Sequence, residues 1–272
     1  MLAQFARETK MICVQDKSID QTDLSLSSGL AASRLRRALD NNELALFCQP
    51  ILALAGAASY PMAEVLIRMR MEEQALLPPG EFLPVFEHYK MMAQLDRWVV
   101  REVVRRLVKG SRVPCFTINV SSQTIEDGEF PAFAAAEMKV VPARSVLFEI
   151  DESDLLARGP AVARFVAAIK SAGGGAVLAD FGRKSVSFGP MAALGPDFVK
   201  VDGAIVRKLL ASEAARTKLS AVLRVGQAVP FGVIAECVEE QGILVLLKSM
   251  GAGFAQGFAV HPPQPIDAIA ES

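Results

Sequence analysis

Histidine is scarce in this chain of 272 residues: only His88 and His261 are present, far apart in the sequence. A histidine-rich metal centre, an H-E-x-x-H site and a histidine-dependent triad are therefore disfavoured. The four cysteines form no C-x-x-C pair, which argues against a zinc ribbon. Any metal ion in this protein is expected to have oxygen ligands, which points to Mg²⁺ or Mn²⁺.

An excess of one charge is also absent, since 29 lysines and arginines stand against 30 aspartates and glutamates. The chain lacks the basic surplus of a nucleic-acid-binding protein, so no DNA or RNA duplex is expected as a partner. Its first residues contain no apolar core of a signal peptide, and its longest uncharged stretch, 249–266, is interrupted by glycine and proline. We therefore expect no membrane span and a cytoplasmic location.

Hydrophobic residues, by contrast, are plentiful. They make up 51% of the chain against 22% charged residues, which is enough for a large core. Residues 1–30 include the polar stretch DQTDLSLSSG and are expected to form a linker or cap. Residues 31–272 are expected to form a single domain.

Short apolar runs alternate with longer amphipathic segments from residue 44 onward. The runs that predict strands are LALFCQPI, YPMAEVLIRM, CFTINV, VLFEI, AVLAD, FVKV, GVIAE and GFAQG. The segments that predict helices begin at Ser33 and then cover 82–88, 93–109, 161–172, 203–225 and 239–250. This alternation predicts an α/β fold, and eight units favour a (β/α)₈ TIM-type barrel. A doubly wound sheet is less favoured because no G-x-G-x-x-G follows the first predicted strand.

Nearly every predicted strand carries a polar residue near its end. Any one of them could simply begin a solvated loop, but barrel enzymes build their sites from the ends of several strands. Carboxylates, amides and a lysine that converge there would suit a hard divalent cation and a phosphate ester. The residues are Gln49, Glu64, Asn119, Glu149, Asp180, Lys200, Glu236 and Gln256.

A set of short segments follows in a fixed order along the chain. They are FCQPI, AEVLIR, PPGEFLPVFE, QLDRWVV, TINVSSQ, FEIDES, ADFG, VKVD, IAECVEE and AQGF. Their order and spacing resemble the EAL domain of cyclic di-GMP signalling, over roughly residues 30–268. The resemblance implies a modified barrel with an antiparallel first strand. Active EAL domains hydrolyse cyclic di-GMP to the linear dinucleotide with two Mg²⁺ or Mn²⁺ ions.

The resemblance also implies roles for individual residues in catalysis and metal binding. Lys200 matches the lysine that orients or deprotonates the attacking water, and Glu236 matches a group that completes the metal and water shell. Glu152 matches the carboxylate that steadies the loop after the fifth strand. The implied metal ligands are Glu64, Asn119, Glu149, Asp180 and Gln256.

A second set of residues matches positions that contact the dinucleotide in the family. Arg68 is the natural phosphate partner among them, because its planar guanidinium offers paired charged donors. The implied contacts are Gln49, Glu64, Leu66, Arg68 and Asp96.

The segment Leu178–Gly182 departs from the family pattern, which has two adjacent aspartates before Phe-Gly. Ala179 stands where active members carry the aspartate that bridges both metal ions. Asp180 is not expected to replace it, because successive strand residues point to opposite faces and a shift by one would need a bulge. We therefore expect at most one bound Mg²⁺ or Mn²⁺ ion and little or no catalysis.

The loop that follows departs from the pattern as well. Arg183-Lys184 replaces the usual Thr-Gly, and the loss of glycine restricts the backbone where the family loop is expected to need freedom. In the family this loop couples the metal site to the dimer interface, so that coupling is in doubt here.

Three interpretations of function follow. The favoured one is a cyclic di-GMP receptor or effector, because the implied ligand contacts are present while the bridging aspartate is missing. The second is a weak, metal-dependent cyclic di-GMP phosphodiesterase. The third is a scaffold that binds a protein partner and no nucleotide, which the presence of Gln49 and Arg68 disfavours. A homodimer and a further protein partner are compatible with each of them.

Overall fold

The computed structural model describes residues 28–41, 43–56, 59–70, 76–183 and 188–270. The linker or cap predicted over residues 1–30 falls almost wholly outside these ranges, and its boundary with the barrel stays a prediction. Lys184 also lies outside the described residues. No helix within the described ranges is long and apolar enough to cross a membrane.

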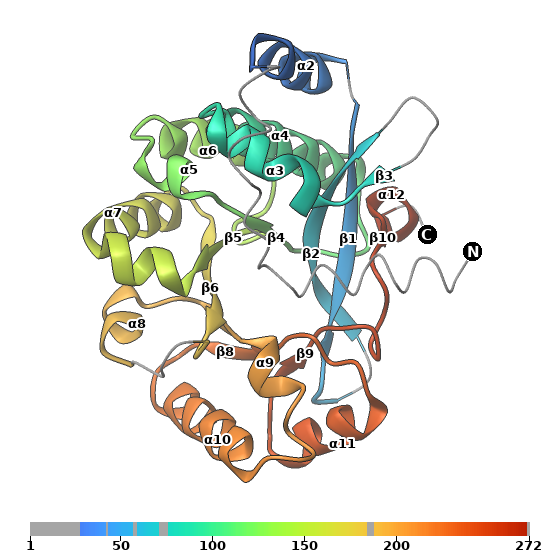
Figure 1. Cartoon of the computed structure of the whole chain (residues 1–272). Helices are drawn as coiled ribbons and strands as arrows, with labels where there is room; N and C mark the ends of the chain where they lie inside the picture. Colours follow the sequence, from blue (N-terminus) through green and yellow to red (C-terminus); the bar gives the residue numbers. More distant parts are fainter. Residues whose placement is uncertain (1–27, 42, 57–58, 71–75, 184–187, 271–272) are drawn as a thin grey trace.

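A closed barrel of eight strands forms the centre of the molecule (Figure 1). The first strand, β1, is antiparallel to both of its barrel neighbours, β2 and β9, while the other adjacent pairs are parallel. The predicted TIM-type barrel with an antiparallel first strand is therefore confirmed. Its strands are β1 (Leu44–Ala53), β2 (Ser59–Arg70), β4 (Phe116–Asn119), β5 (Val146–Asp151), β6 (Gly175–Phe181), β7 (Phe198–Val201), β8 (Gly232–Ala235) and β9 (Phe254–Ala255).

Two short strands that the sequence did not reveal extend the sheet beyond the barrel. β3 (Leu76–Leu77) pairs with the end of β2, and β10 (Gln264–Pro265) pairs with the middle of β1. Both pairings are antiparallel.

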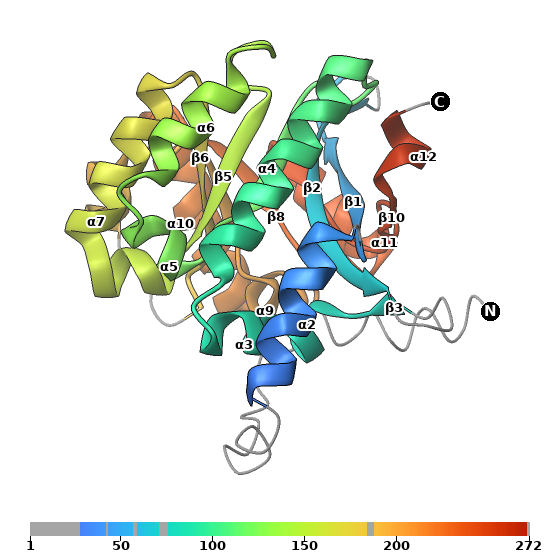
Figure 2. The same cartoon turned by 90° about the horizontal axis from the view of Figure 1, so that it is seen from above.

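Helices surround the barrel on its outer side (Figures 1 and 2). At the N-terminal end of the described chain, α2 lies beside α3. The helices are α2 (Ser28–Asp40), α3 (Pro79–His88), α4 (Met92–Lys109), α5 (Ser122–Glu126), α6 (Phe130–Met138), α7 (Glu152–Ser171), α8 (Phe188–Leu194), α9 (Gly203–Val206), α10 (Glu213–Ala228), α11 (Gln241–Ser249) and α12 (Ile266–Ala270).

The helix predicted from Ser33 begins at Ser28 in the structure, and two further predicted helices differ in how the chain is divided. The segment 203–225, expected to be one helix, is divided into α9 and α10, because Ser212 begins a new helix by accepting a hydrogen bond from the Ala215 amide at 3.2 Å. The segment 161–172 is only the second half of α7. A kink at Arg158, two residues before Pro160, separates it from the first half.

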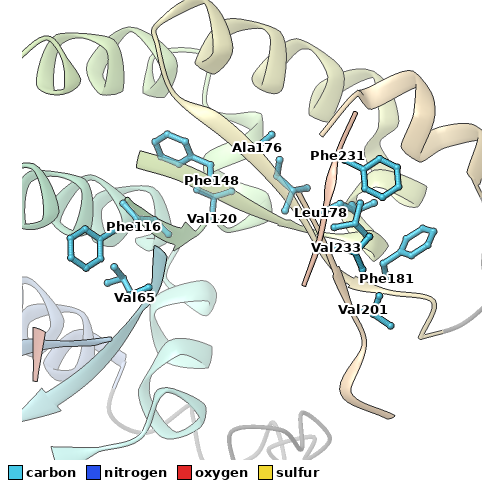
Figure 3. Close-up of a cluster of buried hydrophobic side chains, with 14 of the residues drawn as sticks. Val65, Phe116, Val120, Phe148, Ala176, Leu178, Phe181, Val201, Phe231 and Val233 are labelled. Carbon is cyan, nitrogen blue, oxygen red and sulfur yellow. The ribbon is translucent and has the colours of Figure 1, made fainter. Parts of the chain in front are cut away.

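Apolar side chains fill the space between the strands and the surrounding helices (Figure 3). Phe148 on β5 is fully buried and meets the rings of Phe130 on α6 and Phe165 on α7 edge-on, with centroids 6.1 Å apart in both pairs. Burial of one such ring stabilises the fold by about 1.5–3 kcal/mol. This outer core holds the strands rigidly, so the side chains on their other face have fixed positions.

Candidate functional site

Side chains in the barrel interior are arranged in two tiers. The lower tier is apolar and takes one residue from each strand, namely Ile51, Met62, Cys115, Leu147, Val177, Phe198, Ile234 and Phe254. Because strand residues alternate between faces, the residue two positions nearer the mouth of the barrel lies on the same face. These upper-tier positions hold Gln49, Glu64, Thr117, Glu149, Ala179, Lys200, Glu236 and Gln256.

Six of the eight polar residues predicted at strand ends therefore occupy the upper tier. Asn119 and Asp180 do not, since Thr117 and Ala179 take the tier positions on their strands. The prediction was also wrong in detail for Gln49 and Glu64, which face each other in the middle of β1 and β2. These two long strands form a hairpin that continues past the mouth, so their site residues are not at their ends.

Lys200 stands at the centre of the upper tier with its ammonium group buried. Its Nζ donates to Glu64 Oε2 at 2.6 Å and to Glu149 Oε2 at 2.9 Å. Only 2% of the Lys200 residue is exposed. Burial lowers the pKa of Lys200, but the charges of Glu149 and Glu64 outweigh burial and raise this pKa above its ordinary value. The lysine is therefore a permanent cation between two carboxylates.

The two carboxylates respond differently to this environment. Burial raises the pKa of Glu149 to about 7, and the neighbouring charge of Glu64 adds to the rise. The pKa of Glu64 is lowered, because Lys200 and hydrogen bonds from Asn119 and Gln256 overcome the effect of burial. Thr117 donates a short hydrogen bond to Glu149 Oε1 and so fixes its orientation.

Glu64 joins the cluster to the other side of the barrel. Asn119 Nδ2 donates to Glu64 Oε1 at 2.9 Å, and Gln256 Nε2 donates to Glu64 Oε2 at 2.7 Å. Gln256 Nε2 also lies 3.2 Å from Gln49 Oε1, and Gln49 in turn donates to the carbonyl of His261 at 3.0 Å. Four further sequence-predicted site residues are thus brought into one network with Lys200 and Glu149, namely Gln49, Glu64, Asn119 and Gln256.

A second acidic cluster lies beside the first, at the ends of β6, β7 and β8. Carboxylate oxygens of Asp180, Asp202 and Glu236 approach within 4.8 Å of one another. Burial raises the pKa of Asp180 to about 6 and raises the pKa of Glu236 well above its ordinary value. Arg183 contacts two of the three carboxylates, Asp180 Oδ1 at 2.7 Å and Asp202 Oδ2 at 2.8 Å. The charge of Lys200 acts on the third and opposes the rise in the pKa of Glu236.

The backbone of β6 explains how Asp180 reaches this cluster. The register of β6 against β7 shifts between Leu178 and Phe181, so three residues of β6 span two residues of β7. Asp180 itself has a φ of 56°, in the left-handed region. The bulge that the sequence argument required is therefore present, and Asp180 is turned toward Asp202 and Glu236. Asp180 does not take the tier position of Ala179, and its role as a metal ligand stays a prediction.

Ala179 remains on the upper tier between the two clusters. It pairs with Asp151 on β5 and presents a methyl group where the neighbouring tier positions present Glu149 and Lys200. Lys200 on β7 reaches across β6 to Glu149 on β5. The two acidic clusters consequently share no carboxylate.

Glu152 lies at the start of α7 and contacts the loop that follows the fifth barrel strand. Its Oε2 accepts a hydrogen bond from the Gly182 amide at 3.1 Å. Gly182 has a φ of 87°, so its backbone conformation favours glycine. This contact agrees with the predicted steadying role, which itself stays a prediction.

Arg68 lies at the far end of a stripe on β2. Glu64, Leu66 and Arg68 share one face of the strand, about 13 Å from end to end at 3.3 Å per residue. The Arg68 guanidinium is 5.6 Å from the centre of the Phe47 ring and donates to the Ile67 carbonyl at 2.9 Å. Only 9% of the residue is exposed, and burial lowers its pKa. No carboxylate pairs with it among the residues that the structure describes.

Asp96 is buried in α4 and accepts hydrogen bonds from residues that follow β4. Its Oδ2 accepts hydrogen bonds from the Ser121 amide and hydroxyl, both at 3.0 Å, and from Thr124 Oγ1 at 2.5 Å. Burial raises its pKa to about 6. The structure thus gives Asp96 a structural role at the start of α5, and its contact with the dinucleotide stays a prediction.

Three site residues were not identified from the sequence as members of the site. Thr117 lies two residues before Asn119 on the same strand. It could have been found only from its spacing, because it lies two residues beyond Cys115 of the lower tier. Asp202 directly follows the predicted strand FVKV and caps α9 by accepting from the Ala204 amide at 2.8 Å. Arg183 was noted as a departure from the family pattern but not as a partner of the carboxylates.

The chain belongs to the EAL domain family, whose sequence pattern it matches over residues 32–263. It is 27% identical over 275 aligned residues to the cyclic di-GMP phosphodiesterase PdeB of Shewanella oneidensis, covering 99% of this chain and 32% of that protein. It is 26% identical to the cyclic di-GMP phosphodiesterase PdeF of Escherichia coli, covering 86% of this chain and 32% of that protein. The chain spans about a third of the length of these curated relatives.

Solved structures show the same fold. The PaMucR phosphodiesterase in complex with c-di-GMP superimposes with a TM-score of 0.80 at 23% identity, covering 88% of this chain and 99% of that chain. The FimX EAL domain of Pseudomonas aeruginosa, bound to c-di-GMP, gives a TM-score of 0.78 at 24% identity, covering 86% of this chain and 96% of that chain. The likeness to these structures concerns the barrel itself.

The upper tier and the adjoining Asn119 together have the donor set for one divalent ion. Four side chains here would each bind a metal through an oxygen atom, which is the ligand that Mg²⁺ and Mn²⁺ prefer. They are Glu64, Asn119, Glu149 and Gln256. Gln256 Oε1 is buried and has no hydrogen-bond partner among the described residues, which suits a water or ion at that point. When bound, such an ion would supply Lewis-acid activation of water. The second cluster fits an additional ion poorly, because Arg183 already holds two of its carboxylates.

Proposed function

We propose that this EAL domain is a cyclic di-GMP receptor or effector with little or no hydrolytic activity. The buried guanidinium of Arg68 is the observation that carries this proposal. Removing a cation from water is costly unless an anion compensates it, and the described residues provide Arg68 with a carbonyl and an aromatic ring but no carboxylate. A phosphate of the dinucleotide would supply the missing charge.

The surrounding surface suits the rest of such a ligand. Leu66 offers an apolar contact between Arg68 and Glu64 on the same face of β2, and Phe47 on the adjacent strand already stacks against the guanidinium. A fixed stripe of this kind binds a ligand without large rearrangement, which limits the entropy lost on binding.

The weakness expected for catalysis follows from Ala179. Hydrolysis in the family needs a carboxylate shared by both halves of the site, and the upper tier carries a methyl group at the position between them. Loss of groups that merely orient metal ligands costs about 10–100-fold in metal affinity or activity. Loss of a shared ligand should cost more. Ground-state binding can survive this loss, because it does not depend on groups that stabilise only the transition state.

Calorimetric titration with cyclic di-GMP tests the proposal. Arg68→Ala should weaken binding by about 1.5–3 kcal/mol, which is roughly 10- to 150-fold. Arg70→Ala is the matched control, because Arg70 is exposed at the end of the same strand and should change affinity little. Circular dichroism of both variants would establish that the fold is kept.

The nucleotide recovered after the titration decides between receptor and enzyme. Intact cyclic di-GMP is expected in the presence of Mg²⁺ or Mn²⁺. Metal-dependent hydrolysis at roughly 1 per second or faster would contradict the proposal, since that is an ordinary enzymatic rate. Equal affinity of the wild-type protein and Arg68→Ala would instead favour a scaffold that binds no nucleotide.

A weak phosphodiesterase is the second candidate. It is favoured by the convergence of Glu64, Asn119, Glu149 and Gln256 around Lys200, which retains a buried lysine and the oxygen ligands for one ion. Slow accumulation of the linear dinucleotide that stops on addition of a chelator would support this candidate.

A further inference from the structure

Arg183 occupies a special place between the loops after β6 and β7. Its Nη2 lies 2.7 Å from Asp180 Oδ1, and its Nε donates to Asp202 Oδ2 at 2.8 Å. The two contacts use different nitrogens of one planar guanidinium, so the side chain bridges two carboxylates instead of pairing with a single one. Asp202 is 3% exposed, so one end of this bridge is inside the protein.

The same carboxylates have the geometry of a cation site. Asp180, Asp202 and Glu236 each place an oxygen within 4.8 Å of the others. Such a group of acids repels itself unless a positive charge lies among them. The backbone supports the arrangement at a cost, because Asp180 adopts a φ of 56° that a non-glycine residue seldom takes. When these carboxylates are ionised, a cation among them is therefore needed to relieve the repulsion.

We infer that Arg183 is an internal counter-cation of this cluster: its guanidinium bridges Asp180 and Asp202 and competes with a divalent cation for them. Binding of an ion by these carboxylates then requires Arg183 to leave. This inference does not depend on nucleotide binding, and it adds a second obstacle to metal binding that is separate from the missing carboxylate at Ala179.

The inference distinguishes Arg183 from other arginines close by. Arg207 lies on the C-terminal side of α9, near the same cluster in sequence, but its nearest acidic partner is Glu239 at 3.9 Å. Arg207 does not bridge Asp180 and Asp202. Replacement of either arginine by glutamine changes the net charge equally, which makes Arg207→Gln a matched control for long-range electrostatics.

Binding of Mn²⁺ alone to the full chain provides the test, with free Mn²⁺ measured by electron paramagnetic resonance. Arg183→Gln should bind Mn²⁺ at least about tenfold more tightly than the wild-type protein, a gain of about 1.4 kcal/mol. Arg183→Lys keeps the positive charge within reach of the carboxylates and should stay within about threefold of the wild-type value, as should Arg207→Gln. Equal affinity of Arg183→Gln and Arg207→Gln would overturn the inference.

A second variant locates the added ion. Asp202→Asn keeps an oxygen that can cap α9 but removes a charged ligand. The gain from Arg183→Gln should therefore disappear in the double variant Arg183→Gln/Asp202→Asn. Persistence of the gain would place the ion on the Glu64 cluster and refute the competition.

Thermal unfolding provides a readout that is independent of affinity. Arg183→Gln should be less stable than the wild-type protein in a chelator, and Mn²⁺ should raise its unfolding temperature more than that of the wild-type protein. If Arg183→Gln fails to fold even with Mn²⁺ present, a divalent ion cannot replace the guanidinium, and the inference is wrong.

Discussion

Replacement of Lys200 by methionine tests the electrostatic account of the upper tier. Lys200 is 2% exposed and is hydrogen-bonded to Glu64 and Glu149 at 2.6 and 2.9 Å. Methionine keeps most of the volume but leaves two buried carboxylates without their cation. Removal of one partner from a buried pair costs about 3–5 kcal/mol, so Lys200→Met should lower the free energy of unfolding by this amount.

The size of the effect should depend on pH in a definite direction. The pKa of Glu149 in the folded protein is raised to about 7, so its favourable contribution to stability is present at low pH and is lost as pH rises through that value. Lys200 lowers this pKa, and its removal must raise the pKa further. The folded variant then keeps a proton that the folded wild-type protein has released. Above pH 7 the variant should lose about 1.4 kcal/mol per pH unit relative to the wild-type protein until its own carboxyl ionises.

Urea unfolding at pH 6 and pH 9, in the presence of a chelator, measures both effects. Lys218→Met on α10 is the matched control, because Lys218 is exposed and should change stability little at either pH. A loss below about 1 kcal/mol at pH 9, or a loss that is the same at both pH values, would refute the reasoning.

Three further predictions concern other parts of the barrel. Burial raises the pKa of Asp96 to about 6. As pH rises from 4 to 8, the unfolding free energy of the wild-type protein should therefore fall by about 2–3 kcal/mol more than that of Asp96→Asn, as measured by urea unfolding. Gly257→Ala should cost about 2 kcal/mol or more in urea unfolding, because its Cβ would lie 2.3 Å from the Val238 backbone at a φ of 150°, whereas Gly253→Ala should be tolerated. Ala179→Asp should raise Mn²⁺ affinity and increase hydrolysis of cyclic di-GMP above the parent's level; no change in either would show that the missing carboxylate is not the main defect.

The barrel could be predicted because its signals are local and repeated. Eight apolar runs with helical segments between them are visible in the sequence, and in each the apolar residues recur at the spacing of a strand or a helix. The bounds of α9 and α10 could not be predicted from periodicity alone. Ser212 ends one segment and caps the next, and its side-chain hydrogen bond to the Ala215 amide decides where α10 begins.

The site was predictable to the extent that strand alternation governs it. Glu149, Lys200 and Glu236 each lie two residues beyond an apolar residue of the lower tier, and this spacing can be read from the sequence. Asp180 breaks the rule, because a bulge in β6 and a positive φ change its direction. Alternation fails wherever a strand contains an extra residue, and nothing in the run AVLAD indicates where that residue lies.

The two acidic clusters show how the substitution at position 179 changes the balance of charge in the whole site. Lys200 forms ion pairs with Glu64 and Glu149, and Arg183 forms ion pairs with Asp180 and Asp202. Both cations belong to the chain itself, so each cluster holds a positive charge without a bound ion, although in each cluster the carboxylates outnumber the cation. A carboxylate at position 179 would lie between the clusters and add a negative charge that neither side chain is positioned to balance, which would favour a divalent ion. Because Ala179 presents a methyl group at this position, we expect a weaker demand for a divalent ion here than a carboxylate would create.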